Sequence, residues 1–233
     1  MKCHVGIIAF LVVLCLSVMN VRAESVVTSN GGEICSAAEE FISMTRFGLW
    51  VDDGTHPSIQ CFDVNDQGEI AVGYNGTTNR NKCIGVYDVE GNFLYGYSFR
   101  CVGSFLVEWV DNGELAIYWI RSSVRATFDQ DGKCIDYQTF TIDKEMNKKI
   151  NSLFGVSRTI GNERFYLDKG DGFLSQFALN YSRVIHVGAD GVETTVHSAT
   201  GNPQLSGLFV IAGICFIAFT FIYTFRKRSS TLN

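Results

Sequence analysis

The sequence contains little histidine and none of the short motifs that mark common catalytic sites. Only 4 of its 233 residues are histidine, and outside the N-terminal segment these are His56, His186 and His197. None of them has the spacing of a zinc-binding helix motif, although His186 and His197 could face each other across a hairpin. A Gly-x-Ser-x-Gly nucleophile elbow, a phosphate-binding loop and a dinucleotide-binding fingerprint are also missing. The sequence therefore favours a protein that is not an enzyme, and it predicts no catalytic residue, metal ligand or cofactor.

Positive charge is scarce between the two ends of the chain. Five of the 19 basic residues lie in the end segments, which leaves 14 basic against 24 acidic residues in the middle, a formal charge of about -10. Such a domain repels phosphate backbones at long range, so no nucleic acid is expected among its partners. About 180 residues, 24–204, remain between the ends, which is enough for one domain with its own core.

The N-terminal segment has the pattern of a secretory signal peptide. Lys2 precedes an apolar run from Val5 to Met19, and Val21 and Ala23 supply the small residues accepted at a signal-peptidase site. We therefore predict that residues 1–23 direct export and that cleavage follows Ala23. The alternative is an uncleaved anchor, for which the apolar run is short.

A charge-free run near the C-terminus, 205–225, has the length of a membrane-spanning helix. Three basic residues follow it directly: Arg226, Lys227 and Arg228. The preceding segment, 198–204, contains no Lys or Arg, so the positive-inside rule places the tail, 226–233, in the cytoplasm. The sequence predicts a single-pass plasma-membrane protein, anchored in lipid by this helix, with residues 24–204 outside the cell.

The middle of the chain consists of short apolar-alternating runs separated by turns rich in Asp, Asn and Gly, a pattern typical of β-strands. One turn ends at Gly68 before Glu-Ile-Ala-Val, and another ends at Gly113, 45 positions later, before Glu-Leu-Ala-Ile. An Asp-x-x-Gly turn also repeats, with its glycine at Gly91 and Gly132. Two landmarks with a common period of about 43 residues predict a duplicated unit of four short strands.

A third, weaker copy of the unit is expected after a helical insert. Met146, Ile150 and Leu153 have helical spacing behind a candidate N-cap, Asp143, which predicts a helix at 143–154. A further short helix is an option at 36–42. The expected repeat units are 59–99, 104–140 and 158–198.

The first unit resembles one blade of an NHL-type β-propeller. Residues 59–73 and 84–99 follow that family's order of turn, strand, polar connector, strand, Asp-x-x-Gly turn and aromatic strand. The layout of export signal, repeats and C-terminal anchor is also similar to that of single-pass membrane proteins of gut Firmicutes. The resemblance implies an all-β ectodomain of propeller-like repeats built from short antiparallel strands. NHL propellers usually close with about six blades, whereas this domain has room for about four, so a small or partial propeller, or an open stack of β-meanders, is expected.

Nine aspartates of the middle nearly all precede a glycine, where a carboxylate accepts backbone N–H bonds of a turn: Asp63, Asp66, Asp88, Asp111, Asp129, Asp131, Asp168, Asp171 and Asp190. Calcium binding is an alternative role for Asp129 with Asp131 and for Asp168 with Asp171, but neither pair has the downstream Glu of an EF-hand loop. Glu108 is the one outer-strand acid that suggests the metal site of a propeller lactonase. A surface hydrolase or lactonase-like enzyme is therefore the alternative function.

The exported part contains an odd number of cysteines, so at least one thiol has no partner within the chain. Cys61 and Cys134 fall at repeat positions that hold Leu106 and Phe93 in the other unit. Positions for apolar side chains suit buried thiols as well as disulfides, so the pairing stays open.

Aromatic residues are dense in the first two units, and most of them are expected between packed sheets. A minority could line a binding surface, for which the candidate residues are Trp109, Tyr118 and Trp119. The leading hypothesis is a membrane-anchored cell-surface module that binds or scaffolds an unknown surface protein or glycan. An accessory or sensor subunit of a membrane complex is a further alternative.

Overall fold

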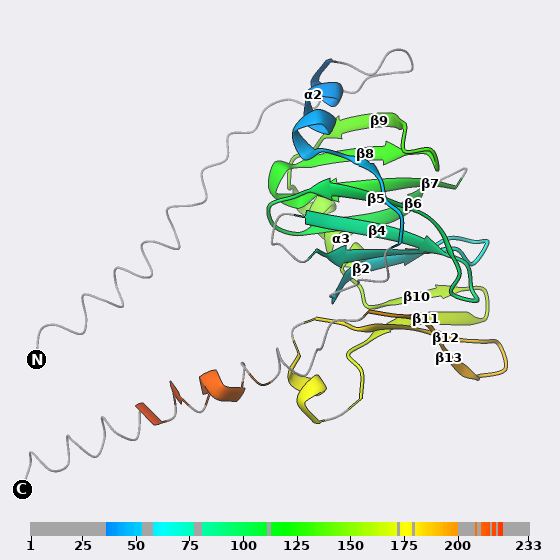
Figure 1. Cartoon of the computed structure of the whole chain (residues 1–233), viewed down its shortest axis with the longest axis vertical. Helices are drawn as coiled ribbons and strands as arrows, with labels where there is room; N and C mark the ends of the chain where they lie inside the picture. Colours follow the sequence, from blue (N-terminus) through cyan, green and yellow to red (C-terminus); the bar gives the residue numbers. More distant parts are fainter. Residues whose placement is uncertain are drawn as a thin grey trace, which may run out of the picture.

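The structure is a computed structural model that describes most of the middle of the chain. The described residues are 36–52, 58–76, 81–110, 113–171, 173–178, 180–199, 208, 211–214, 216–217 and 219–220. They form mainly antiparallel β-sheet with a few short helices, which confirms the all-β part of the predicted fold class (Figure 1). The predicted signal peptide, 1–23, and the predicted cytoplasmic tail, 226–233, lie outside the described residues.

The predicted membrane span, 205–225, also lies largely outside the described residues. Those of its residues that are described are helical. Across the described part of the chain, no helix combines the length and the apolarity needed to cross a bilayer. The span therefore stays a prediction from the sequence.

The strands form three sheets, here called sheets A, B and C. Sheet A has the order β1-β5-β4-β3-β2 and contains β1 (Gly48–Leu49), β2 (Ser58–Val64), β3 (Ile70–Asn75), β4 (Asn81–Tyr87) and β5 (Phe93–Arg100). Sheet B has the order β6-β7-β8-β9 and contains β6 (Phe105–Val110), β7 (Glu114–Trp119), β8 (Val124–Phe128) and β9 (Cys134–Thr139). Sheet C has the order β10-β11-β12-β13 and contains β10 (Ser157–Ile160), β11 (Glu163–Asp168), β12 (Arg183–Val187) and β13 (Glu193–Ser198).

Each sheet is one four-stranded meander, apart from the extra strand β1 on sheet A. The meanders span 58–100, 105–139 and 157–198, close to the three repeat units that the sequence predicts. The same turn recurs between the third and fourth strands. In it Gly91 donates its N–H to the Asp88 carbonyl, as Gly132 does to that of Asp129, each at 3.0 Å. Both glycines have positive φ, which explains why glycine recurs there.

Sheet A lies between sheets B and C. One buried cluster joins Ile84, Val86 and Tyr97 of sheet A to Ile117 and Phe128 of sheet B. A second cluster joins the opposite face of sheet A to sheet C, through residues Phe62, Val72, Tyr87, Phe165 and Val184. Because both faces of sheet A are covered, β3 is an almost continuous apolar run rather than an alternating one.

This order differs from that of consecutive propeller blades. If the sheets followed one another in chain order like propeller blades, sheet B would lie between sheets A and C. In the structure sheet A lies in the middle, because sheets B and C pack on its two faces. The described strands show no closure into a ring. Their arrangement matches the alternative of an open stack of β-meanders. Side-chain packing decides this order, and the repeat period carries no information about it.

Two helices cover parts of this stack that the strands leave open. Figure 1 shows α2 (Ser36–Thr45) beside β8 and β9. Phe41 of this helix packs edge-on against Trp119 with ring centroids 5.2 Å apart, and Phe47, which follows the helix, stacks on Phe128 at 3.9 Å. The second helix, α3 (Lys144–Leu153), lies in the predicted insert, and its N-cap, Asp143, accepts a 2.7 Å bond from the Met146 N–H. Two short 3₁₀ segments complete the described elements of the middle, η2 (Ile120–Ser122) and η3 (Phe173–Phe177).

Candidate functional site

The three aromatic candidates from the sequence do not form one surface. Tyr118 and Trp119 are both buried, and as neighbours on β7 they point to opposite faces of sheet B. Trp109 is half-buried and pairs with Leu115, whereas Trp119 pairs with Phe105. Four residue steps along β6 therefore separate the two tryptophans, about 13 Å at the usual rise of a strand.

Tyr118 belongs to a polar network between sheet B and α3. Its hydroxyl donates a 2.5 Å hydrogen bond to Glu108 Oε2, and Lys149 Nζ lies 3.0 Å from the same oxygen. Burial and the bond to Glu108 raise the pKa of Tyr118. Glu108 on β6 therefore links α3 to sheet B through Lys149. Among the described residues, no group of three or more His, Cys, Asp or Glu side chains is placed to hold a metal ion.

The two histidines of sheet C do not face each other. Val184 is the cross-strand partner of His197, and His186 pairs with Thr194. His186 Nε2 lies 3.0 Å from Glu163 Oε2, and its ring stacks on Phe165 at 4.5 Å. The prediction that His186 and His197 could face each other across the hairpin is therefore wrong, because the register between β12 and β13 gives each a different partner. The stacking on Phe165 shows that His186 contributes to packing.

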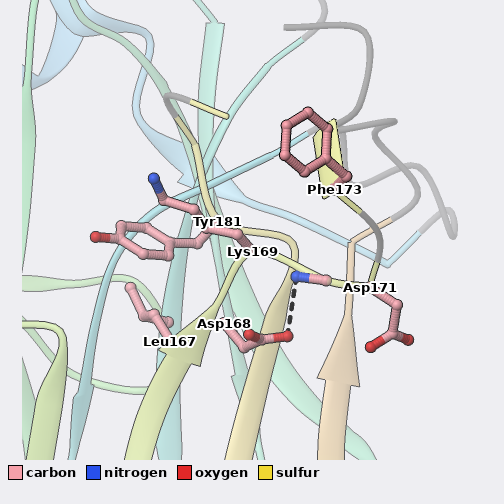
Figure 2. Close-up of a pocket in the computed structure, with 7 residues that line it drawn as sticks. Leu167, Asp168, Lys169, Asp171, Phe173 and Tyr181 are labelled. Atoms are coloured by element: carbon pink, nitrogen blue, oxygen red, sulfur yellow. Dashed lines mark hydrogen bonds between the residues drawn. The ribbon is translucent and has the colours of Figure 1, made fainter. Parts of the chain in front are cut away.

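A polar cavity lies at the end of sheet C, where β11 leads into the long connection 169–182. We call it the loop pocket (Figure 2). It measures about 730 Å³ and is lined by Leu167, Asp168, Lys169, Gly170, Asp171, Phe173 and Tyr181. Its far wall is fixed to sheet A, because the Ile59 N–H donates a 2.9 Å bond to the Tyr181 carbonyl.

Arg183 holds the two carboxylates of the loop pocket in place. It donates from Nε to Asp168 Oδ2 at 2.8 Å, and from Nη1 and Nη2 to the two oxygens of Asp171 at 3.0 Å each. The Gly170 N–H adds a 2.9 Å bond to Asp168 Oδ2, drawn as the dashed line in Figure 2. The Arg183 guanidinium lowers the pKa of Asp171, whose side chain is still 91% exposed.

This arrangement bears on the calcium role considered for Asp168 and Asp171. The positive charge between these carboxylates is the guanidinium of Arg183, which bonds to both. Since it occupies carboxylate oxygens that would bind a cation, the pair is an ion-pair cluster that fixes hydrogen-bond acceptors at the pocket mouth.

Aromatic side chains form the other side of the loop pocket. Phe173 is 67% exposed, and its ring packs edge-on against Phe177 at 5.2 Å. Lys169 Nζ lies over the Tyr181 ring, 6.0 Å from its centroid. Figure 2 shows the Phe173 ring above Asp171, and the Tyr181 ring at the left of the view above Leu167. The pocket therefore offers an apolar ring face and ionised acceptors to the same ligand.

The sequence patterns described above do not indicate Phe173, Tyr181 or Arg183 as site residues. A signal was available, because 169–182 is a long connection between consecutive strands of one sheet, and long connections often carry binding residues.

Searches of family models, curated proteins and solved structures find no match to this chain.

Proposed function

We propose that this chain is a membrane-anchored cell-surface module that binds a glycan through the loop pocket. The carrying observation is that Arg183 fixes the Asp168 and Asp171 carboxylates beside the exposed ring of Phe173. The membrane anchor, the export signal and the likeness to NHL-type propeller repeats enter this proposal from the sequence.

The chemistry of the pocket suits a sugar. The C–H face of a sugar ring is apolar and packs on an aromatic ring, while its hydroxyl groups donate hydrogen bonds. Each carboxylate has about four lone-pair sites for hydrogen bonds. The Asp171 side chain is 91% exposed, so a ligand can reach its oxygens. Lys169 adds a donor on the Tyr181 side. An acidic partner would instead meet two carboxylates at the mouth, which disfavours it.

Binding is better supported than hydrolysis. A glycosidase needs one carboxylic acid that keeps its proton near neutral pH. The Arg183 guanidinium acts in the opposite direction on Asp171, because it lowers the pKa of that carboxyl. The loop pocket therefore supplies acceptors rather than an acid.

The test is binding of the purified full chain to an array of glycans, followed by titration of any sugar that binds. We expect Phe173→Ala and Asp171→Asn each to weaken binding about tenfold or more. Matched controls are Phe154→Ala, an exposed phenylalanine at the end of α3, and Asp131→Asn, an exposed aspartate in a turn of sheet B. Failure to bind any glycan, or equal binding by the pocket and control variants, would reject the proposal.

A further inference from the structure

A second cavity lies at the opposite side of sheet A, where α2 meets η2 and the end of β5. It measures about 660 Å³, and its wall includes Phe41, Met44, Arg100, Val102, Trp119 and Arg121. We call it the arginine pocket. We infer that it binds a small organic anion, a carboxylate or a phosphate monoester carried on an apolar body. This inference is independent of glycan binding.

The apolar part of the wall is exposed to water without a ligand. Met44 is 65% exposed and Val102 is 54% exposed, although both border the buried rings of Phe41 and Trp119. A ligand body lying between them would remove this apolar surface from water, which favours binding. A cavity of this size is within the range that holds small organic ligands.

The polar part of the wall carries two positive charges. Arg100 ends β5 and Arg121 lies in η2, both are exposed, and neither forms an ion pair with another described residue. This contrasts with Arg125, Arg158 and Arg183, which each bind a carboxylate. In a domain where acidic residues outnumber basic ones, two arginines on one cavity that pair with no acid of the described residues favour an anion supplied by a ligand.

Trp119, one of the lining residues, also contains a buried donor. The Trp119 indole N–H is shielded from water and forms no hydrogen bond with another described residue. Guanidinium groups bind carboxylates and phosphates through two parallel N–H bonds, so Arg100 and Arg121 can recognise either group. The ligand we infer therefore carries an oxyanion on an apolar stem. The titration described next distinguishes a carboxylate from a phosphate.

The experiment is a titration of the purified full chain with four phenyl-bearing probes. Calorimetry and tryptophan fluorescence measure the binding of each probe. The anionic probes are 3-phenylpropionate and phenyl phosphate, the neutral probe is 3-phenylpropanol, and the cationic probe is 3-phenylpropylamine. We expect saturable binding of at least one anion at one site, and binding at least about tenfold weaker for the neutral and cationic probes. Which anion binds more tightly distinguishes a carboxylate ligand from a phosphate ligand.

Variants place the binding in the arginine pocket. Arg100→Gln and Arg121→Gln should each weaken anion binding about tenfold, and Met44→Glu, which adds a negative charge at the wall, should abolish it. The matched control is Arg164→Gln, which removes one exposed arginine from sheet C. The thermal unfolding midpoint of every variant is measured to check that the fold is retained. The inference would be overturned if 3-phenylpropanol bound as tightly as the anionic probes, or if all three pocket variants kept the anion affinity of the unaltered chain. Glycan binding is measured separately on the array.

Discussion

Asp63 Oδ1 accepts a 2.7 Å hydrogen bond from Arg158 Nε, and this ion pair links β2 of sheet A to β10 of sheet C. The two side chains are only 13% and 16% exposed. Asp63 Oδ2 also accepts a 2.8 Å bond from the Trp109 N–H on β6, the first strand of sheet B. Arg158 Nη2 donates to the carbonyls of Phe62 and Leu153. One buried pair therefore stands where all three sheets and the end of α3 meet.

Removing either partner of this pair should destabilise the domain strongly. We expect Asp63→Ala and Arg158→Ala each to cost about 3 to 5 kcal/mol, because each leaves the other charge buried without its partner. Urea unfolding of the purified chain measures the difference. The control is Asp66→Ala, an exposed turn residue on the same hairpin, for which we expect a change within about 0.5 kcal/mol. A loss below about 1 kcal/mol for both pair variants would show that the joint contributes little.

Two turn glycines should respond differently to the same substitution. Gly91 and Gly113 both have positive φ, so alanine at either position costs about 1 to 2 kcal/mol of backbone strain. A Cβ at Gly113 would meet no atom of the described residues within 4 Å, whereas one at Gly91 would lie 2.2 Å from the Val196 carbonyl oxygen on β13. Gly91→Ala should therefore lower the free energy of unfolding by at least about 1 kcal/mol more than Gly113→Ala. Equal losses would argue that the β4–β5 turn does not contact sheet C.

The repeats could be predicted because their signals are local. Gly91 and Gly132 recur at the same place in their units since the Asp-x-x-Gly turn requires positive φ at that position. The helix α3 likewise follows from the spacing of Ile150 and Leu153 behind Asp143. The order of the sheets could not be predicted, because it depends on contacts such as those of Phe165 and Val184 with sheet A, which involve residues far apart in the sequence.

The sites were harder to predict than the fold. Aromatic density pointed to Tyr118 and Trp119, but strand alternation places these neighbours on opposite faces, where Tyr118 binds Glu108 and Trp119 fills the core. The bond between Arg183 and Asp168 depends on a strand register set across the connection 169–182. Nothing local in the sequence specifies that register.

The loop pocket should keep its ion pair in mildly acidic solution. Arg183 lowers the pKa of Asp171 below its ordinary value of 3.8, so the stabilisation from this carboxylate is present above pH 3.8 and is lost as the pH falls through the lowered pKa. An NMR titration of the Asp171 carboxyl should give a midpoint below that of the unfolded chain, and Arg183→Gln should raise it. Arg183→Lys keeps the charge without the planar fork and should give an intermediate value. An unchanged midpoint in Arg183→Gln would contradict the pairing.

The predicted topology can be tested in intact cells. If residues 205–225 span the membrane, protease added outside should remove the β-domain, and a tag placed after Asn233 should be degraded only after the cells are permeabilised. Replacing Arg226, Lys227 and Arg228 by glutamine should weaken this orientation, because the positive charges hold the tail inside. Labelling of the tag from outside in cells that make the unaltered chain would reverse the assignment.

Cys61 should be inert in the folded protein. Cys61 carries a free, buried thiol, and burial raises its pKa to about 12. At pH 8 only roughly one Cys61 thiol in ten thousand is then ionised, and the thiolate is the form that reacts. We expect iodoacetamide to modify Cys61 only after unfolding in guanidinium chloride, as read by peptide mass spectrometry. An exposed thiol introduced by Asp66→Cys on the same hairpin should react at the ordinary rate and serves as the control. Rapid modification of Cys61 in the native chain, or its recovery in a disulfide, would show that this part of the core is open.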